Sequence, residues 1–138
     1  EHRRSYTNKA EMEDRYEDGA EITIMAISAG RLNALEASKI LTEKGIKHNL
    51  CHICWLKPFE PTAQLLENLK KSKVGLVIDS DFELAGASQA FSYELMHKTG
   101  AKVYALGLED RVCGVAPQCE NITPSPEKIV EKVESLLS

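Results

Sequence analysis

Short runs of hydrophobic residues alternate along this chain with segments whose hydrophobic residues recur every three to four positions. Continuous hydrophobic runs are typical of strands that are covered on both faces of a sheet. Three runs of this kind predict strands, at Ile22–Ile27, Val74–Ile78 and Val103–Leu108. The alternation over Leu50–Leu56 predicts a further strand, which Pro58 and Pro61 end.

Helical spacing predicts four helices that alternate with and follow these strands. Their hydrophobic positions are Leu32, Leu35, Ile40 and Leu41 in the first, Leu65, Leu66 and Leu69 in the second, Ala87, Ala90, Phe91 and Leu95 in the third, and Ile129, Val130, Val133, Leu136 and Leu137 in the last. Lys44-Gly45 supplies a stop for the first helix. Ser125 followed by Pro126 predicts an N-cap and first turn for the last. Strands alternating with helices predict a three-layer α/β/α sandwich on a mostly parallel sheet.

The first residues are polar, and we expect residues 1–9 to be a flexible segment before one domain at 10–138. Ala10, Met12 and Tyr16 alternate as in a half-exposed edge strand, although propensity would also allow a helix.

The 138 residues suffice for one domain with one core. A formal net charge of −4 with interspersed signs argues against nucleic acid as a partner. No hydrophobic run is long enough to span a membrane and no secretory signal is visible, so we expect a cytoplasmic protein with reduced cysteines.

Cys51 and Cys54 have the spacing of a metal or redox motif. In a strand they would point to opposite faces, and no helix N-terminus follows to favour a thiolate, so small buried cysteines are the preferred interpretation. A zinc site would need ligands such as His48, Cys113 and Cys119 from elsewhere. A reactive thiol at Cys113 or Cys119 stays open. The histidines show no common spacing; they are His2, His48, His52 and His97.

Two loops after predicted strands are the best candidates for a site, because α/β sheets bind ligands at the carboxyl ends of strands that diverge. The candidate residues are Ser28, Gly30 and Arg31 in the first loop and Asp79, Asp81, Gly86 and Ser88 in the second. Arg31 at a helix N-terminus could hold an anion. Alternatively, Gly30 and Gly86 only permit tight turns. Asp79, Asp81 and Glu83 could act as a general acid and base, but acidic residues before a helix are usually solvated or cap the helix. No known catalytic motif occurs, so no catalytic, cofactor-binding or metal residue is assigned.

Four segments, in this order and spacing, resemble the C-terminal domain of thiamine-diphosphate enzymes of the transketolase and 2-oxo acid dehydrogenase beta-subunit type. They are Ile22–Arg31, Trp55–Glu60 with its Leu-Lys-Pro-Phe core, Glu83–Leu95 and Ile122–Val130. The resemblance covers about residues 10 to 138. The single glycine of Leu84-Ala-Gly86-Ala-Ser88 departs from the glycine-rich dehydrogenase pattern and leaves the branch open.

The resemblance implies a mixed five-stranded sheet whose first strand, around residues 10–16, is an antiparallel edge. It also implies a parent enzyme that uses thiamine diphosphate and Mg²⁺ held by other domains, none of whose cofactor motifs map onto this chain. We therefore expect a structural and dimerisation domain, not catalytic alone, whose partners are the cofactor-binding domains or subunit in a homo-oligomer. The alternatives are a module that binds a small anionic effector or a partner between loops 28–31 and 79–88, and a redox or metal domain that uses Cys51 and Cys54.

Overall fold

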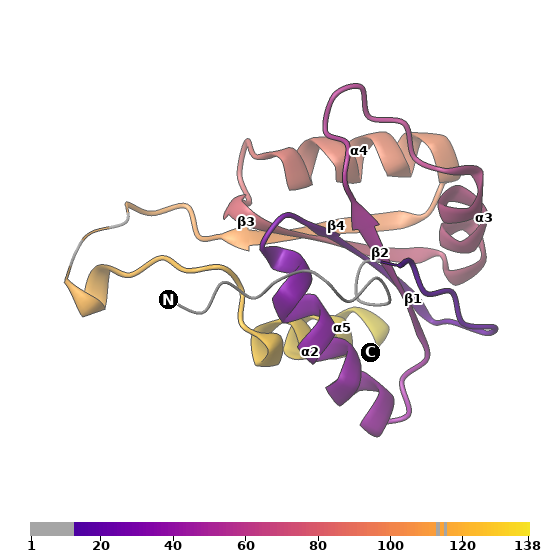
Figure 1. Ribbon diagram of the computed structural model, residues 1–138, viewed down its shortest axis with the longest axis horizontal. Coiled ribbons are helices and arrows are strands. Elements are labelled where there is room, and N and C mark those ends of the chain that lie inside the picture. The colour runs from indigo at the N-terminus through magenta and orange to yellow at the C-terminus, as the bar shows by residue number, and fades with distance from the viewer. Residues whose placement is uncertain (1–12, 113, 115) are drawn as a thin grey trace.

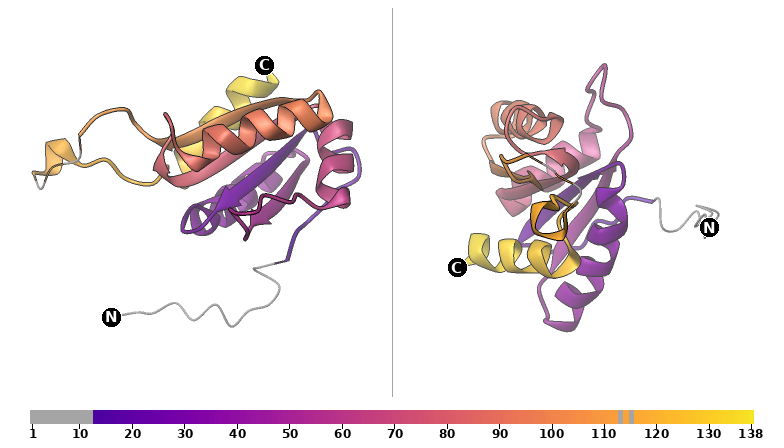
Figure 2. Two further views of the ribbon diagram at one scale, coloured as in Figure 1. Left: turned by 90° about the horizontal axis from the view of Figure 1, so that it is seen from above. Right: turned by 90° about the vertical axis from the view of Figure 1, so that its left-hand side faces the viewer.

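A parallel sheet between two layers of helices forms the protein, and the computed structural model describes residues 13–112, 114 and 116–138 (Figure 1). Within these residues the strand order is β2-β1-β3-β4, all parallel. The strands are β1 (Ile22–Ile27), β2 (His48–Ile53), β3 (Val74–Phe82) and β4 (Lys102–Leu108). Helices α2 (Gly30–Glu43) and α5 (Pro126–Leu137) cover one face, and α3 (Ala63–Ser72) and α4 (Ala87–Thr99) cover the other (Figures 1 and 2). The predicted α/β/α sandwich is confirmed.

Alternate side chains of β1 enter two different cores, which explains its continuous hydrophobic run. Ile22, Ile24 and Ala26 face α2 and α5 in one cluster, whereas Met25 and Ile27 belong to the cluster under α3 and α4. All six residues of β1 are buried. The strand therefore lies in the middle of the molecule, with β2 and β3 on its two sides.

Side-chain caps fix the starts of two helices. The hydroxyl oxygen of Thr62 accepts a hydrogen bond from Leu65 N at the start of α3. Ser125 does the same for Lys128 N at the start of α5, with Pro126 in the first turn. The predicted cap of the last helix is confirmed.

The expected fifth strand is reduced to one antiparallel bridge in the described part of the chain. Arg15 N donates to Leu50 O at 2.8 Å, and Leu50 N donates to Arg15 O at 2.9 Å. The described sheet therefore has four strands rather than five. Residues 10–12 of the predicted edge strand, and the segment 1–9, lie outside the described residues.

Two strand ends differ from the prediction. β2 ends at Ile53 rather than Leu56, and Trp55 beyond it is 75% exposed. β3 continues to Phe82 through an irregularity, so Asp79–Phe82 is strand rather than the expected loop. In α4, Ala90 is exposed, and Ser88 and Ser92 accompany Phe91 and Leu95 on the buried face.

The segment between β4 and α5 extends away from the body of the domain (Figures 1 and 2). Asn121 holds its base together: its Oδ1 accepts from Glu109 N at 3.0 Å, and its Nδ2 donates to Glu109 O at 2.8 Å and to Arg111 O at 3.1 Å. Val112, 87% exposed, lies farther along this segment.

Candidate functional site

The candidate site lies at the edge where the four parallel strands end and their loops begin. The start of α2 packs directly onto β3 at Ile78, four residues before this strand ends. A Cβ on Gly30 would lie 3.2 Å from Ile78 Cγ2 and 3.3 Å from Ile78 O, which is tighter than most contacts. Ser28 has a left-handed backbone with φ 48°. Gly30 thus permits a close approach of helix and strand at Ile78, one residue before the predicted second loop begins.

Arg31 turns away from this meeting point. Its side chain is fully buried, and Nη2 donates to the backbone oxygen of Glu13 at 3.0 Å. Burial lowers the pKa of the guanidinium, and the nearby carboxylate of Asp14 opposes that shift. The predicted anion contact in the crevice therefore gains no support from the position of Arg31.

Asp79 and Asp81 of the predicted second loop lie in β3 and accept hydrogen bonds from the neighbouring backbone. Asp79 is buried, and its Oδ1 accepts from Ser80 N at 2.7 Å and from Asp81 N at 3.3 Å. Asp81 Oδ1 accepts from Phe82 N at 2.7 Å. These bonds engage the two carboxylates with the backbone of the next one or two residues, and neither carboxylate caps α4, whose start has no side-chain cap among the described residues.

The end of this loop is governed by close backbone contact. A Cβ on Gly86 would lie 1.9 Å from Phe82 O, so only glycine fits there. Ser88 follows in the first turn of α4, buried, with its Oγ lacking a hydrogen-bond partner among the described residues. Gly86 therefore permits a tight turn, as one of the two sequence interpretations required.

A polar cluster that sequence analysis missed joins residues 13–17 to the end of β2. Asp14 Oδ1 accepts from His52 N at 2.7 Å, and the Tyr16 hydroxyl donates to Asp14 Oδ2 at 3.3 Å. Burial, followed by the charge of Arg31, lowers the pKa of His52. No sequence signal links Asp14 with His52, because they are 38 positions apart and meet only through the antiparallel bridge.

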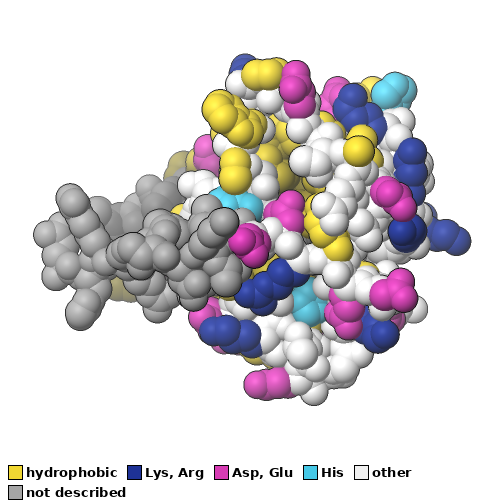
Figure 3. Space-filling view, turned by 45° about the vertical axis from the view of Figure 1, so that its right-hand side comes forward, with side chains coloured by type: hydrophobic (Ala, Val, Ile, Leu, Met, Phe, Trp, Pro, Cys, Tyr) yellow, Lys and Arg dark blue, Asp and Glu magenta, His cyan; other side chains and the backbone are white. Residues whose placement is uncertain are grey.

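A pocket of about 240 Å³ opens beside this cluster, between residue 14 and the β2–α3 loop. Its lining combines aromatic, acidic and thiol groups. The lining residues are Asp14, His52, Ile53, Cys54, Trp55, Phe59, Glu60, Pro61, Thr62 and Leu65. The face drawn in Figure 3 shows hydrophobic side chains gathered in its upper part, next to a histidine and acidic side chains.

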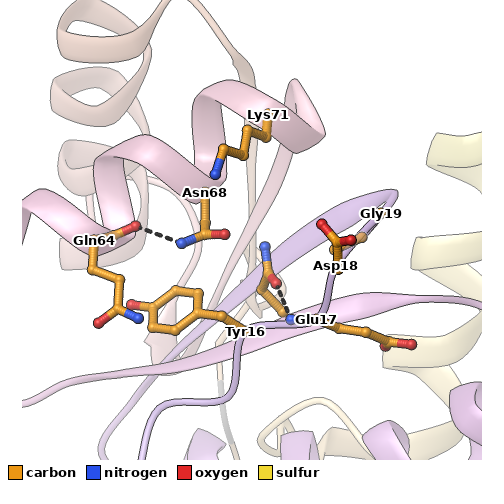
Figure 4. Close-up of a pocket in the computed structure, with 9 residues that line it drawn as sticks. Tyr16, Glu17, Asp18, Gly19, Gln64, Asn68 and Lys71 are labelled. Carbon is orange, nitrogen blue, oxygen red and sulfur yellow. Dashed lines mark hydrogen bonds between the residues drawn. The ribbon is translucent and has the colours of Figure 1, made fainter.

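A larger, more polar pocket of about 500 Å³ lies between α3 and the segment before β1 (Figure 4). The side chains of Gln64, Asn68 and Lys71 line it from α3, and Tyr16 closes the opposite side. Lys71 is already paired with Glu67 at 2.9 Å, and Asn68 Nδ2 donates to Gln64 O at 2.9 Å. Part of the polar lining is thus already engaged.

Cys51 and Cys54, which have the spacing of a metal or redox motif, differ in burial. Cys51 is 1% exposed, and burial raises the pKa of its thiol to about 12. Cys54 is exposed just past the end of β2, and Cys119 is half-buried. In the described residues no three His, Cys, Asp or Glu side chains gather as metal ligands would. Cys113 lies outside the described residues.

Of the other described histidines, His48 is held in the interior and His97 lies in α4. His48 Nε2 and Ser38 Oγ lie 2.6 Å apart in the interior, and His48 Nδ1 is 2.8 Å from Ile46 O. His97 is in the last turn of α4, where its ring is stacked with that of Tyr93 at a centroid distance of 6.4 Å. His2 lies outside the described residues. None of the described helices has the length and hydrophobicity that crossing a membrane requires.

Comparison with known proteins agrees with this fold. A family model described as "Transketolase, C-terminal domain" matches residues 10–129. The chain belongs to the transketolase C-terminal domain family. The resemblance found in the four sequence segments is thereby confirmed. No curated protein sequence matches the chain.

Two solved structures are similar to this transketolase C-terminal domain. One is a 2-oxoglutarate:ferredoxin oxidoreductase from Magnetococcus marinus with 2-oxoglutarate, coenzyme A and succinyl-CoA bound, at 22% identity and a TM-score of 0.66 over 91% of this chain and 19% of that one. The other is a split-gene transketolase, an inactive beta4 tetramer, at 22% identity and a TM-score of 0.71. This match covers 91% of the present chain and 41% of the transketolase chain. The present chain thus spans about a fifth and about two fifths of their lengths, and the likeness shows the fold.

Proposed function

We propose that this chain is the C-terminal structural domain of a thiamine-diphosphate-dependent enzyme of the transketolase or 2-oxo acid dehydrogenase beta-subunit type. It packs against the cofactor-binding domains or subunit, contributes to a homo-oligomer, and is not catalytic alone. Family membership supports the general class. The packing role is supported by the distribution of exposed hydrophobic side chains.

Six of the nine large exposed hydrophobic side chains in the described residues lie at or beyond the carboxyl ends of the strands. They are Trp55, Leu56, Phe82, Leu84, Val112 and Ile122; the other three, Tyr93, Met96 and Tyr104, lie in α4 and β4. Single exposed hydrophobic residues are ordinary, but a concentration on one edge is typical of an interaction surface. This concentration is the observation on which the packing role rests.

The first described residues lie at the same edge. Glu13 and Asp14 lie beside Arg31 and His52, which mark the start of α2 and the end of β2. Residues 15–17 then run antiparallel to β2, toward its beginning. Glu13 and Asp14 therefore lie at the edge that carries the exposed hydrophobic side chains.

The described residues do not fit thiamine diphosphate and Mg²⁺. A diphosphate-bound Mg²⁺ needs carboxylate or amide oxygens that converge. Asp79 instead accepts backbone hydrogen bonds, and Arg31 is buried against Glu13. We therefore assign no catalytic step to this chain.

Calorimetry and sedimentation test the proposal together. Titration of the purified chain with thiamine diphosphate and Mg²⁺ is expected to give no binding heat, and a micromolar affinity would contradict the assignment. Without its partner domains the exposed edge should drive reversible self-association, which Leu84→Asp weakens. Tyr93→Asp, on α4, places the same charge away from the edge and serves as the matched control. A strictly monomeric chain, or equal effects of the two substitutions, would count against the packing role.

Anion binding between loops 28–31 and 79–88 remains the alternative, with less support because Arg31 is buried. A ligand specific to the folded state must raise the melting temperature. When small anions are screened, we therefore expect no increase in melting temperature that depends on Arg31. A shift of that kind would favour the alternative.

A further inference from the structure

The pocket at the end of β2 combines aromatic rings with carboxylates. Trp55 and Phe59 supply the rings, and Asp14 and Glu60 supply the acidic groups. The Phe59 ring is held in place by stacking on Phe91, with ring centroids 4.1 Å apart. Aromatic faces attract cations through their quadrupole, and tryptophan does so best. Carboxylates in the same pocket add to that attraction.

The charges around the pocket leave Glu60 as its uncompensated acidic group. The carboxylate of Asp14 is oriented by His52 N and the Tyr16 hydroxyl, and the buried guanidinium of Arg31 acts on it electrostatically. Glu60, by contrast, forms no ion pair with a described residue.

The imidazole of His52 adds no opposing charge. Burial and Arg31 lower the pKa of His52, so it is neutral near pH 7. Lys57 belongs to the same loop but does not line the pocket. The lining is therefore net negative, with an aromatic wall.

We propose that this pocket binds an organic cation, a guanidinium or alkylammonium on a short hydrophobic stem, presented by an arginine or lysine side chain of the neighbouring domain. Its volume of about 240 Å³ is below the roughly 300 Å³ at which pockets for drug-sized ligands begin, and it suits a single side chain. The source of the cation rests on the function proposed above, whereas the chemistry of the pocket does not.

Trp55 is the only tryptophan of the chain, so its fluorescence reports directly on this pocket. Titration with N-acetylarginine amide is expected to change Trp55 emission saturably, with a millimolar dissociation constant. N-acetyllysine amide should behave similarly. N-acetylcitrulline amide has the shape of the arginine probe without its charge and should bind about fivefold more weakly or worse.

Two variants test the assignment of the groups. Glu60→Gln should weaken binding of the arginine probe about two- to fivefold and flatten its salt dependence. Glu131→Gln removes the same charge from α5, on the opposite face of the sheet, and should leave binding unchanged. Trp55→Leu, followed by calorimetry, should also weaken binding about two- to fivefold.

Three results would overturn the proposal: no saturable change of emission, equal binding of the citrulline and arginine probes, or equal effects of Glu60→Gln and Glu131→Gln. A micromolar affinity for the free amide would identify a small-molecule ligand and overturn the side-chain source. Because self-association is measured separately, failure of the pocket and failure of the packing role are distinguishable.

Discussion

Alkylation of the cysteines tests whether Cys51 and Cys54 form a reactive pair or two unrelated thiols. Only the thiolate is nucleophilic. Burial raises the pKa of Cys51 from 9.0 to about 12. Near neutral pH this lowers its thiolate fraction about a thousandfold relative to an unperturbed cysteine. Steric exclusion adds to the effect, since Cys51 is 1% exposed whereas Cys54 is exposed.

Native protein is therefore treated with a limiting amount of iodoacetamide, and each cysteine peptide is followed by mass spectrometry. We expect Cys54 to be modified at the rate of an ordinary surface thiol and Cys51 at least about a thousandfold more slowly. Alkylation in urea, where both thiols are accessible, is the control. Comparable native rates for the two residues, or stoichiometric zinc that either substitution removes, would refute the argument from strand geometry and burial.

Three further predictions concern stability, measured by urea unfolding. The pKa values of Cys51 and Tyr16 are raised in the folded state, so the unfolded state releases these protons at lower pH. The free energy of unfolding should therefore fall as pH rises from about 9 to 12, and it should fall less steeply in Cys51→Ala. The same pH dependence in the variant and the unsubstituted protein would contradict this. Gly86→Ala should lower the free energy of unfolding by about 3 kcal/mol, since the added Cβ would clash with Phe82 O. A loss below about 1 kcal/mol would show that the turn relaxes easily. Asn121→Ala should lower the free energy of unfolding by about 1–2 kcal/mol, because three hydrogen bonds are lost but water can hydrate the freed groups. An unchanged free energy of unfolding would show that Asn121 does not stabilise its segment.

The α/β/α sandwich could be predicted from sequence because a strand that is buried on both faces has a continuous run of hydrophobic residues. Every residue of Ile22–Ile27 is buried, and the predicted limits of this strand agree with the structure. The last helix was equally clear, since Ser125 and Pro126 determine its start and a hydrophobic stripe faces the core. Such signals are local and need no knowledge of distant contacts.

Strand ends were harder to predict because distant segments determine them. Trp55 continues the alternation of β2 but is exposed, and the Phe59 ring farther along the loop stacks on Phe91 of α4. The acidic residues after Ile78 suggested a loop, yet β3 continues beside β4. Gly107 permits this, since a Cβ there would lie 2.5 Å from Asp81 O.

Sequence reasoning could place the two candidate loops after parallel strands, but not the contacts of their side chains. In the structure Gly30 lies against Ile78 of β3, and the loop before Gly30 follows β1, a parallel neighbour of β3. The direction of the Arg31 side chain was not predictable, since it depends on the backbone of Glu13, 18 positions earlier. The pairing of Asp14 with His52 was likewise invisible in the sequence.

The opposite ends of the domain have different uses in the laboratory. Lys44, just after α2, pairs with Glu134 near the end of α5 at 2.6 Å, so the last helix finishes on the side of the molecule away from the strand ends. A purification handle or surface anchor attached after Ser138 would leave the exposed tryptophan accessible. A label on the side chain of Asp14 would instead lie in the same pocket as Trp55 and interfere with binding measurements made there.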